Sequence, residues 1–142
     1  MGAGRLLPFL VAVVYGACIV ACWGLTSLVT DTDVIRYPDA GPLLGPAMAL
    51  AAGLVALGWF TRVARSPQRR GTAVLAAVTI WAAMLVVGAV GYTLTRGSVA
   101  WLLLFAGDYA ASPFLLLPAV LVIPLLFAAG ALARTPKPFD PR

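Results

Sequence analysis

The sequence contains no histidine and no glutamate in its 142 residues, and it contains two cysteines. Without histidine, the usual zinc and copper sites, histidine-ligated haem and imidazole-based nucleophilic triads are excluded. Without glutamate, proton carriers built on that side chain are excluded as well. Chemically active groups are limited to five aspartates, two cysteines, four tyrosines and the basic residues. We therefore expect no cofactor, no metal site and no catalytic residues.

Charged residues are also scarce. They form 11% of the chain, against about 25% in soluble domains, and hydrophobic residues form 62%, against roughly 45–50%. A water-soluble fold of this length cannot bury so much apolar surface, so the expected surroundings are a lipid bilayer. Basic loops facing an anionic leaflet explain the net charge of +5, and we expect no nucleic-acid partner.

Four apolar runs are long enough to cross a bilayer as helices, which takes about 20 residues. They cover residues 6–29, 43–61, 72–94 and 113–132. A further apolar stretch at residues 99–107 is too short to cross, and Asp108 follows it. Ser112 and Pro113 are typical of a helix cap and a first helical residue, which predicts that the fourth span starts there.

The predicted fold is a single all-α integral membrane domain over residues 1–142. It has four transmembrane helices and a short re-entrant or interfacial segment before the fourth. A five-span alternative would place Asp108 near the middle of the bilayer. The cost of burying that charge makes the alternative less favourable.

The basic residues are distributed unequally between the gaps. Eight of the ten lie before the first run, between the second and third, or after the last, whereas only Arg36 and Arg96 lie in the other gaps. Because loops rich in arginine and lysine stay inside, both termini are predicted to be cytoplasmic. The basic residues are nine arginines and one lysine, and alanine, valine, leucine and glycine dominate, a bias that fits a G+C-rich bacterial genome. We therefore expect the protein in a bacterial plasma (inner) membrane. The inner loop is expected to meet anionic lipid headgroups or a cytoplasmic partner through Arg62, Arg65, Arg69 and Arg70.

The first run has an alternative interpretation as a cleaved signal peptide, because residues 19–22 loosely match a lipoprotein cleavage box ending at Cys22. Apolar sequence continues beyond that cysteine, so the run is longer than a signal core and we expect a retained helix. Cys18 and Cys22 lie one helical turn apart, which does not suit a disulfide. We interpret both as packing residues.

Small residues recur every fourth position in the second span, at Gly45, Ala49 and Gly53. This spacing lets two helix backbones approach closely. We expect the contact to lie within the bundle, with a seam between chains as the alternative. Pro118 and Pro124 interrupt the fourth span and predict a kink whose freed carbonyls are satisfied by neighbouring groups.

Aromatic residues near the span ends are typical of membrane interfaces, with Trp23, Tyr92 and Trp101 on the outer side and Trp59 and Phe60 on the inner side. Tyr15 and Trp81 fall deeper in their spans. Their polar tips need hydrogen-bond partners inside the bundle.

A polar patch is predicted on the outer face, formed by Arg96, Asp108, Tyr109 and Ser112. One interpretation is a ligand or ion-entry site. The preferred interpretation is a surface turn with an ordinary Arg96–Asp108 ion pair, because exposed pairs of this kind are common and weak.

A functional site inside a membrane usually contains charged residues, and the four spans contain none. The sequence therefore favours a small non-enzymatic bacterial protein, an accessory, assembly or scaffold subunit of a membrane complex. The alternative is an oligomeric transporter or channel for an uncharged or hydrophobic substrate. Expected partners are the lipid bilayer, anionic lipid headgroups, and a membrane protein or a second copy of the chain.

Overall fold

The computed structural model describes residues 3–37, 40–65 and 70–133, and within these ranges the secondary structure is entirely helical. Four long helices are α1 (Ala3–Thr30), α2 (Leu44–Arg65), α3 (Arg70–Arg96) and α5 (Pro113–Leu132), and α4 (Ala100–Tyr109) is short. Each of the four long helices is apolar enough to cross a membrane. The protein is an all-α, multi-pass membrane protein, as predicted.

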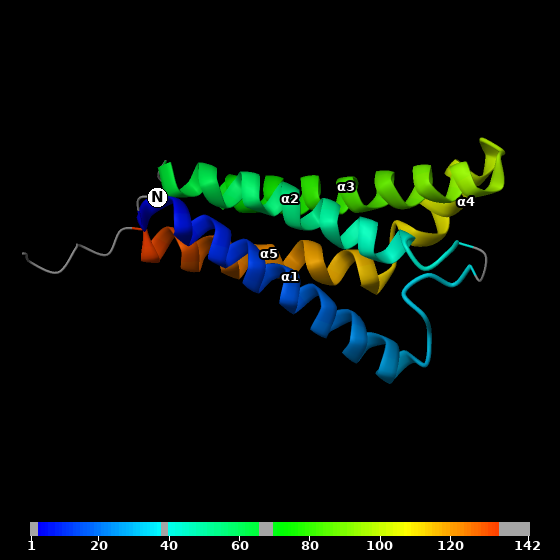
Figure 1. Cartoon of the computed structure of the whole chain (residues 1–142), viewed down its shortest axis with the longest axis horizontal. Coiled ribbons are helices and arrows are strands. Elements are labelled where there is room, and N and C mark those ends of the chain that lie inside the picture. Colours follow the sequence, from blue (N-terminus) through cyan, green and yellow to red (C-terminus); the bar gives the residue numbers. More distant parts are fainter. Residues whose placement is uncertain (1–2, 38–39, 66–69, 134–142) are drawn as a thin grey trace, which may run out of the picture.

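The long helices run side by side along the longest axis of the molecule (Figure 1). One end contains the start of α1, the end of α2, the start of α3 and the end of α5; we call it the Arg62 end. The opposite end, here the α4 end, holds α4 and the loop that follows α1 (Figure 1). Toward the α4 end, α1 diverges from the other helices, which remain together.

The helix boundaries follow the sequence pattern closely. Helix α5 covers the residues predicted for the fourth span. Helix α4 corresponds to the predicted short outer segment, residues 99–107. Ten helical residues extend only about 15 Å, so α4 is too short to cross a bilayer. Helix α2 continues past the predicted residue 61 because its last turn carries Arg62 and Arg65, which interact favourably with the negative end of the helix dipole. At the α4 end, Gly97 has a φ of 68°, a left-handed conformation that ends α3 and reverses the chain.

Helix α2 buries one residue in every turn against its neighbours, namely Leu44, Met48, Ala52, Ala56 and Phe60. This core stripe lies one position before the stripe of small residues predicted to form the helix contact. A Cβ added at Gly53 would meet no atom within 4 Å, and one at Gly45 would only touch Ile35 at 3.9 Å. The predicted close contact inside the bundle at Gly45, Ala49 and Gly53 is therefore wrong for Gly53; the alternative of a seam between chains stays a prediction.

The close approaches inside the bundle occur at two glycines of α3. A Cβ at Gly88 would lie 2.7 Å from Cε1 of Phe105 and 3.0 Å from Sδ of Met48, and a Cβ at Gly91 would overlap Leu44. Only a glycine at position 88 leaves room for the buried Phe105 ring of α4 beside α3. These two glycines allow α2, α3 and α4 to pack at the α4 end.

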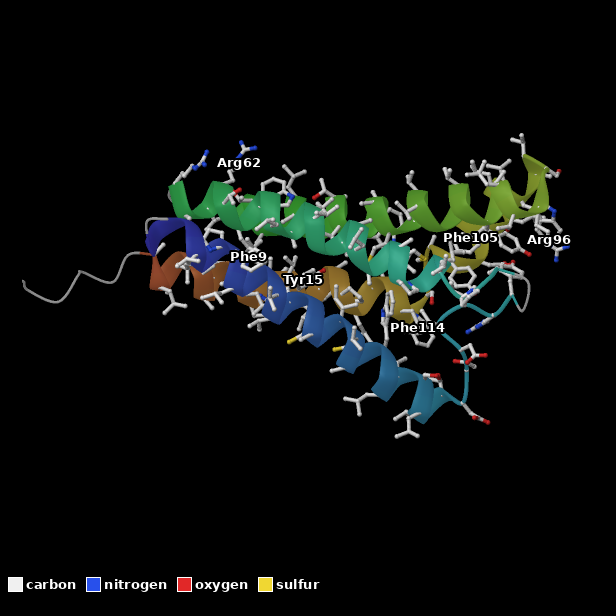
Figure 2. The ribbon with its side chains drawn as sticks, viewed as in Figure 1. Phe9, Tyr15, Arg62, Arg96, Phe105 and Phe114 are labelled. Atoms are coloured by element: carbon white, nitrogen blue, oxygen red, sulfur yellow. The ribbon has the colours of Figure 1, made fainter. Side chains whose placement is uncertain are left out.

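Three aromatic side chains satisfy backbone carbonyls near α5. Pro118 has no N–H, so the carbonyl of Phe114 loses its helical donor; the indole Nε1 of Trp23 donates to that oxygen at 2.7 Å instead. The hydroxyl of Tyr15 donates to the carbonyl of Pro118 at 2.9 Å, and Tyr15 points from α1 toward α5 (Figure 2). Trp81 caps α4 by donating to the carbonyl of Ala110 at 2.8 Å. The expected hydrogen-bond partners of Tyr15 and Trp81 are confirmed, and the Phe114 carbonyl freed by Pro118 has a donor from a neighbouring helix. The kink itself stays a prediction. Trp23, Phe60 and Tyr92 are buried rather than facing an interface.

Candidate functional site

The loop after α1 is fastened to α4 by two hydrogen bonds. The hydroxyl of Tyr37 donates to the carboxylate of Asp108, and the backbone N–H of Arg36 donates to the hydroxyl of Tyr109. These bonds join residues more than 70 positions apart in sequence. They fix the loop over the start of α5 and bring its polar groups to the α4 end.

An aromatic cluster holds the same loop from the other side. The ring of Tyr37 stacks on Tyr92 of α3, with centroids 4.7 Å apart and planes inclined by 18°. Within α4, Phe105 stacks on Tyr109 at 4.3 Å. Trp101 meets the rings of Tyr37 and Tyr92 edge to face. Edge-to-face and offset pairs add to the stability gained by burial, so the loop position is well determined.

Arg96 lies beside this cluster and contacts its aromatic faces. Its guanidinium carbon is 5.0 Å from the Trp101 ring centroid, and its Nε donates to the hydroxyl of Tyr92 at 3.2 Å. The Asp108 carboxylate accepts a hydrogen bond from Tyr37, and Arg96 lies over aromatic rings, so the predicted Arg96–Asp108 ion pair stays a prediction. A cation over an aromatic face is attracted by the ring quadrupole.

A polar cavity of about 280 Å³ opens between the loop, the end of α4 and the start of α5. We define it by its lining residues Arg36, Tyr37, Asp108, Tyr109 and Ser112. Three of the four residues predicted for the outer patch line it, and Arg96 does not. Sequence reasoning missed two lining residues. Arg36 carried a weak signal, as one of two basic residues in the outer gaps, and Tyr37 carried none.

The tyrosines of the cavity keep their protons at neutral pH. The hydrogen bond to Asp108 raises the pKa of Tyr37 to about 12, and loss of solvent adds to the effect. Burial also raises the pKa of Tyr109, although the hydrogen bond from Arg36 opposes this shift. Both hydroxyls therefore remain donors.

A second cavity is an apolar groove of about 750 Å³ between α1, α2 and the loop. It lies where α1 diverges from the bundle (Figure 1). Asp33 is its charged residue, and the remaining walls are apolar or small: Gly16, Val20, Trp23, Val34, Ile35, Gly41, Pro42, Gly45, Pro46, Ala49 and Leu50. Gly45 and Ala49 of the predicted packing stripe thus line an open groove.

The basic residues of α2 lie far from both cavities. Arg62 and Arg96 occupy opposite ends of the molecule (Figure 2). Arg62 and Arg65 are exposed in the last turn of α2, and the Arg62 guanidinium lies 5.5 Å from the Trp59 ring centroid. Arg69 lies outside the described residues, as do the C-terminal Arg134, Lys137 and Arg142, and Arg70 is described only as the first residue of α3.

The two cysteines are free and half-buried in α1. Within the residues that the structure describes, histidine, cysteine and acidic side chains form no group able to hold a metal ion. The possible cleavage at Cys22 stays untested.

Four membrane-length apolar helices, with a polar cavity at one end of the bundle, define a multi-pass helical membrane protein. The chain belongs to a family of unknown function, DUF6121, whose profile matches residues 4–138. No curated protein and no solved structure matches the chain.

Proposed function

We propose that this chain is a non-enzymatic accessory or scaffold subunit that holds a transmembrane helix of a partner protein in the apolar groove between α1 and α2. The observation that carries this proposal is the groove itself, an apolar cavity of about 750 Å³ bounded by two membrane-length helices. Its depth comes from small residues on both walls, such as Gly16 on α1 and Gly45 and Ala49 on α2.

The space at these small residues suits a helix backbone. A Cβ added at Gly16 would meet no atom within 4 Å, and one at Gly45 would make an ordinary contact. Helices in a bilayer associate through close packing, because lipid tails supply no hydrophobic driving force between them. At the Cβ positions of Gly16 and Gly45, helices α1 and α2 do not contact each other. A partner helix placed against these two glycines gains dispersion contacts with both walls.

The negative charge of Asp33 favours a partner helix that carries a basic residue. Asp33 is exposed and lies among apolar lining residues at the α4 end. A partner helix with an arginine or lysine near the corresponding end pairs with this carboxylate. Neighbouring residues of α1 remain largely exposed, with Val20 at 66% and Leu25 at 63%, so the partner has room to extend along α1.

We further propose that the Arg62 end faces the cytoplasm of a bacterial cell and that the chain resides in the plasma membrane. Arg62 lies at that end (Figure 2), and both Arg62 and Arg65 are exposed in the last turn of α2. Basic side chains of short loops are retained on the cytoplasmic side and are attracted by anionic headgroups. Arg62 and Arg65, with Arg69 and Arg70, which follow in the sequence, then anchor the inner face.

Photocrosslinking in the native membrane tests the partner. A crosslinking amino acid at Val20, inside the groove, should yield a defined adduct with a foreign membrane protein, and the same amino acid at Leu54, outside it, should not. Gly45→Leu should abolish the adduct because it fills the groove. Gly58→Leu is the matched control, since Gly58 lies on the same helix with open space around it.

Three outcomes contradict the proposal: adducts with lipid only, adducts with a second copy of this chain, and an adduct that survives Gly45→Leu. An adduct between two copies would instead support the oligomeric transporter or channel.

A further inference from the structure

The polar cavity presents hydrogen-bond donors that the described part of the chain leaves without acceptors. Tyr109 accepts from the backbone N–H of Arg36, so its own hydroxyl hydrogen is available. Ser112 is the N-cap of α5, yet its side chain makes no capping hydrogen bond. The guanidinium of Arg36 is exposed and also lines the cavity. Three donors, one of them charged, therefore converge on one space.

The same cavity holds a negative charge. One oxygen of the Asp108 carboxylate accepts from Tyr37, and the other oxygen remains able to accept. Arg36 donates to Tyr109 through its backbone N–H and so keeps its guanidinium available, and within the described part of the chain no ion pair joins it to Asp108. A cation and an anion that are held apart in one cavity are complementary to a zwitterion with anionic oxygens at one end and an ammonium group at the other.

The position of the cavity indicates that the zwitterion is a lipid headgroup. Ser112 immediately precedes the membrane span Pro113–Leu132. Trp101, which is partly exposed and of a residue type common at the membrane interface, belongs to the adjoining aromatic cluster. The cavity therefore lies at the level of lipid headgroups. Its volume of about 280 Å³ is just below that of pockets for drug-sized ligands, roughly 300–1,000 Å³, and suits a headgroup.

We propose that the polar cavity binds the headgroup of an ethanolamine phospholipid. The phosphate receives hydrogen bonds from the Arg36 guanidinium and from the hydroxyls of Tyr109 and Ser112. The ammonium group donates to the free oxygen of Asp108. A choline headgroup has no N–H to donate, and a glycerol headgroup has no cation to balance Asp108, so both should bind more weakly.

Native mass spectrometry of the purified full-length chain tests this assignment. Lipids with ethanolamine, choline and glycerol headgroups and identical acyl chains are added in equal amounts to the detergent-solubilised protein. We expect about tenfold preference for the ethanolamine lipid, the size of one charge-assisted hydrogen bond. Equal retention of the choline or glycerol lipid overturns the proposal.

Two substitutions test the assigned roles without removing the bonds that hold the loop. Arg36→Gln keeps the backbone N–H that donates to Tyr109, and Asp108→Asn keeps an oxygen that accepts from Tyr37. Each should reduce retention of the ethanolamine lipid about tenfold. Matched controls are Arg96→Gln and Asp31→Asn, because neither residue lines the cavity. Unchanged retention in Arg36→Gln or Asp108→Asn, or equal loss in the controls, overturns the assignment.

A soluble competitor separates a lipid from a free zwitterion. Glycerophosphoethanolamine carries the same headgroup without acyl chains. We expect it to displace the lipid only in large excess, because acyl chains hold the lipid beside the protein. Displacement at equal concentration overturns the lipid as the natural ligand and assigns the cavity to a soluble zwitterion.

Discussion

A hydrogen-bond donor lost on one helix of this protein is replaced by a side chain from another helix. Pro118 removes a donor from α5, and Trp23 supplies another from α1 at 2.7 Å. Each residue alone leaves a polar group unpaired: the proline frees a carbonyl in α5, and the indole N–H of α1 needs an acceptor in apolar surroundings. Together they leave the Phe114 carbonyl satisfied and join α1 to α5.

This compensation predicts a specific double-mutant cycle. Trp23→Phe removes the donor and keeps most of the ring, so we expect a loss of about 1 kcal/mol in the free energy of unfolding in detergent. Pro118→Ala restores the N–H of residue 118, which can then bond the Phe114 carbonyl. In that background Trp23→Phe should cost clearly less. Chemical unfolding followed by circular dichroism measures all four proteins, and an equal cost in both backgrounds contradicts the interpretation.

At the scale of helices, packing depends on where glycine permits close approach. The small-residue stripe of α2 lies beside an open groove, whereas Gly88 and Gly91 of α3 lie against side chains of α4 and α2. The α2 stripe has the four-residue spacing typical of close helix contacts, whereas Gly88 and Gly91 are three positions apart. The difference arises from which neighbour each helix meets.

Gly88→Ala should therefore destabilise the protein. Its Cβ would lie 2.7 Å from the ring of Phe105, which is fully buried and stacked on Tyr109. Overpacking of this kind costs about 1–3 kcal/mol. Gly58→Ala is the control, because its Cβ meets open space and alanine favours a helix by about 0.5–1 kcal/mol over glycine. Thermal unfolding in detergent measures both; equal melting temperatures would show that Phe105 moves aside freely.

The sequence was sufficient to predict the spans and insufficient to predict the site. Hydropathy marks a membrane helix directly, and Ser112 before Pro113 marked the start of α5. The partner of Asp108 is Tyr37, 71 positions away, and that contact depends on how α1 and its loop return to the bundle. Likewise, periodicity found the stripe at Gly45 and Ala49, but only the neighbouring helices decide whether such a stripe is packed or open.

At the scale of the whole molecule, charge is segregated between the two ends. Arg62 and Arg65 lie at one end, and Asp33, Arg36 and Asp108 lie at the other with both cavities. In the orientation proposed above, the exposed Arg62 and Arg65 face the cytoplasm.

Reporter fusions test this orientation. Fusions at Gln68 and Arg142 should report the cytoplasm, and a fusion at Asp33 should report the outside. Alkaline phosphatase, active only outside, and green fluorescent protein, fluorescent only inside, give opposite readings at each site. A C-terminal fusion active as phosphatase would contradict cytoplasmic termini and favour an odd number of spans.

The hydrogen bonds of α1 also have a consequence for the order of synthesis. Tyr15 and Trp23 are made early, but their acceptors on α5 follow 103 and 91 positions later. Until α5 enters the bilayer, both polar tips lie in lipid without these acceptors, and an unpaired polar group in hydrocarbon is unfavourable. A chain truncated before Pro113 therefore keeps a helix that cannot complete its packing. A membrane quality-control protease can recognise such a helix, so a finished chain should outlive an unfinished one.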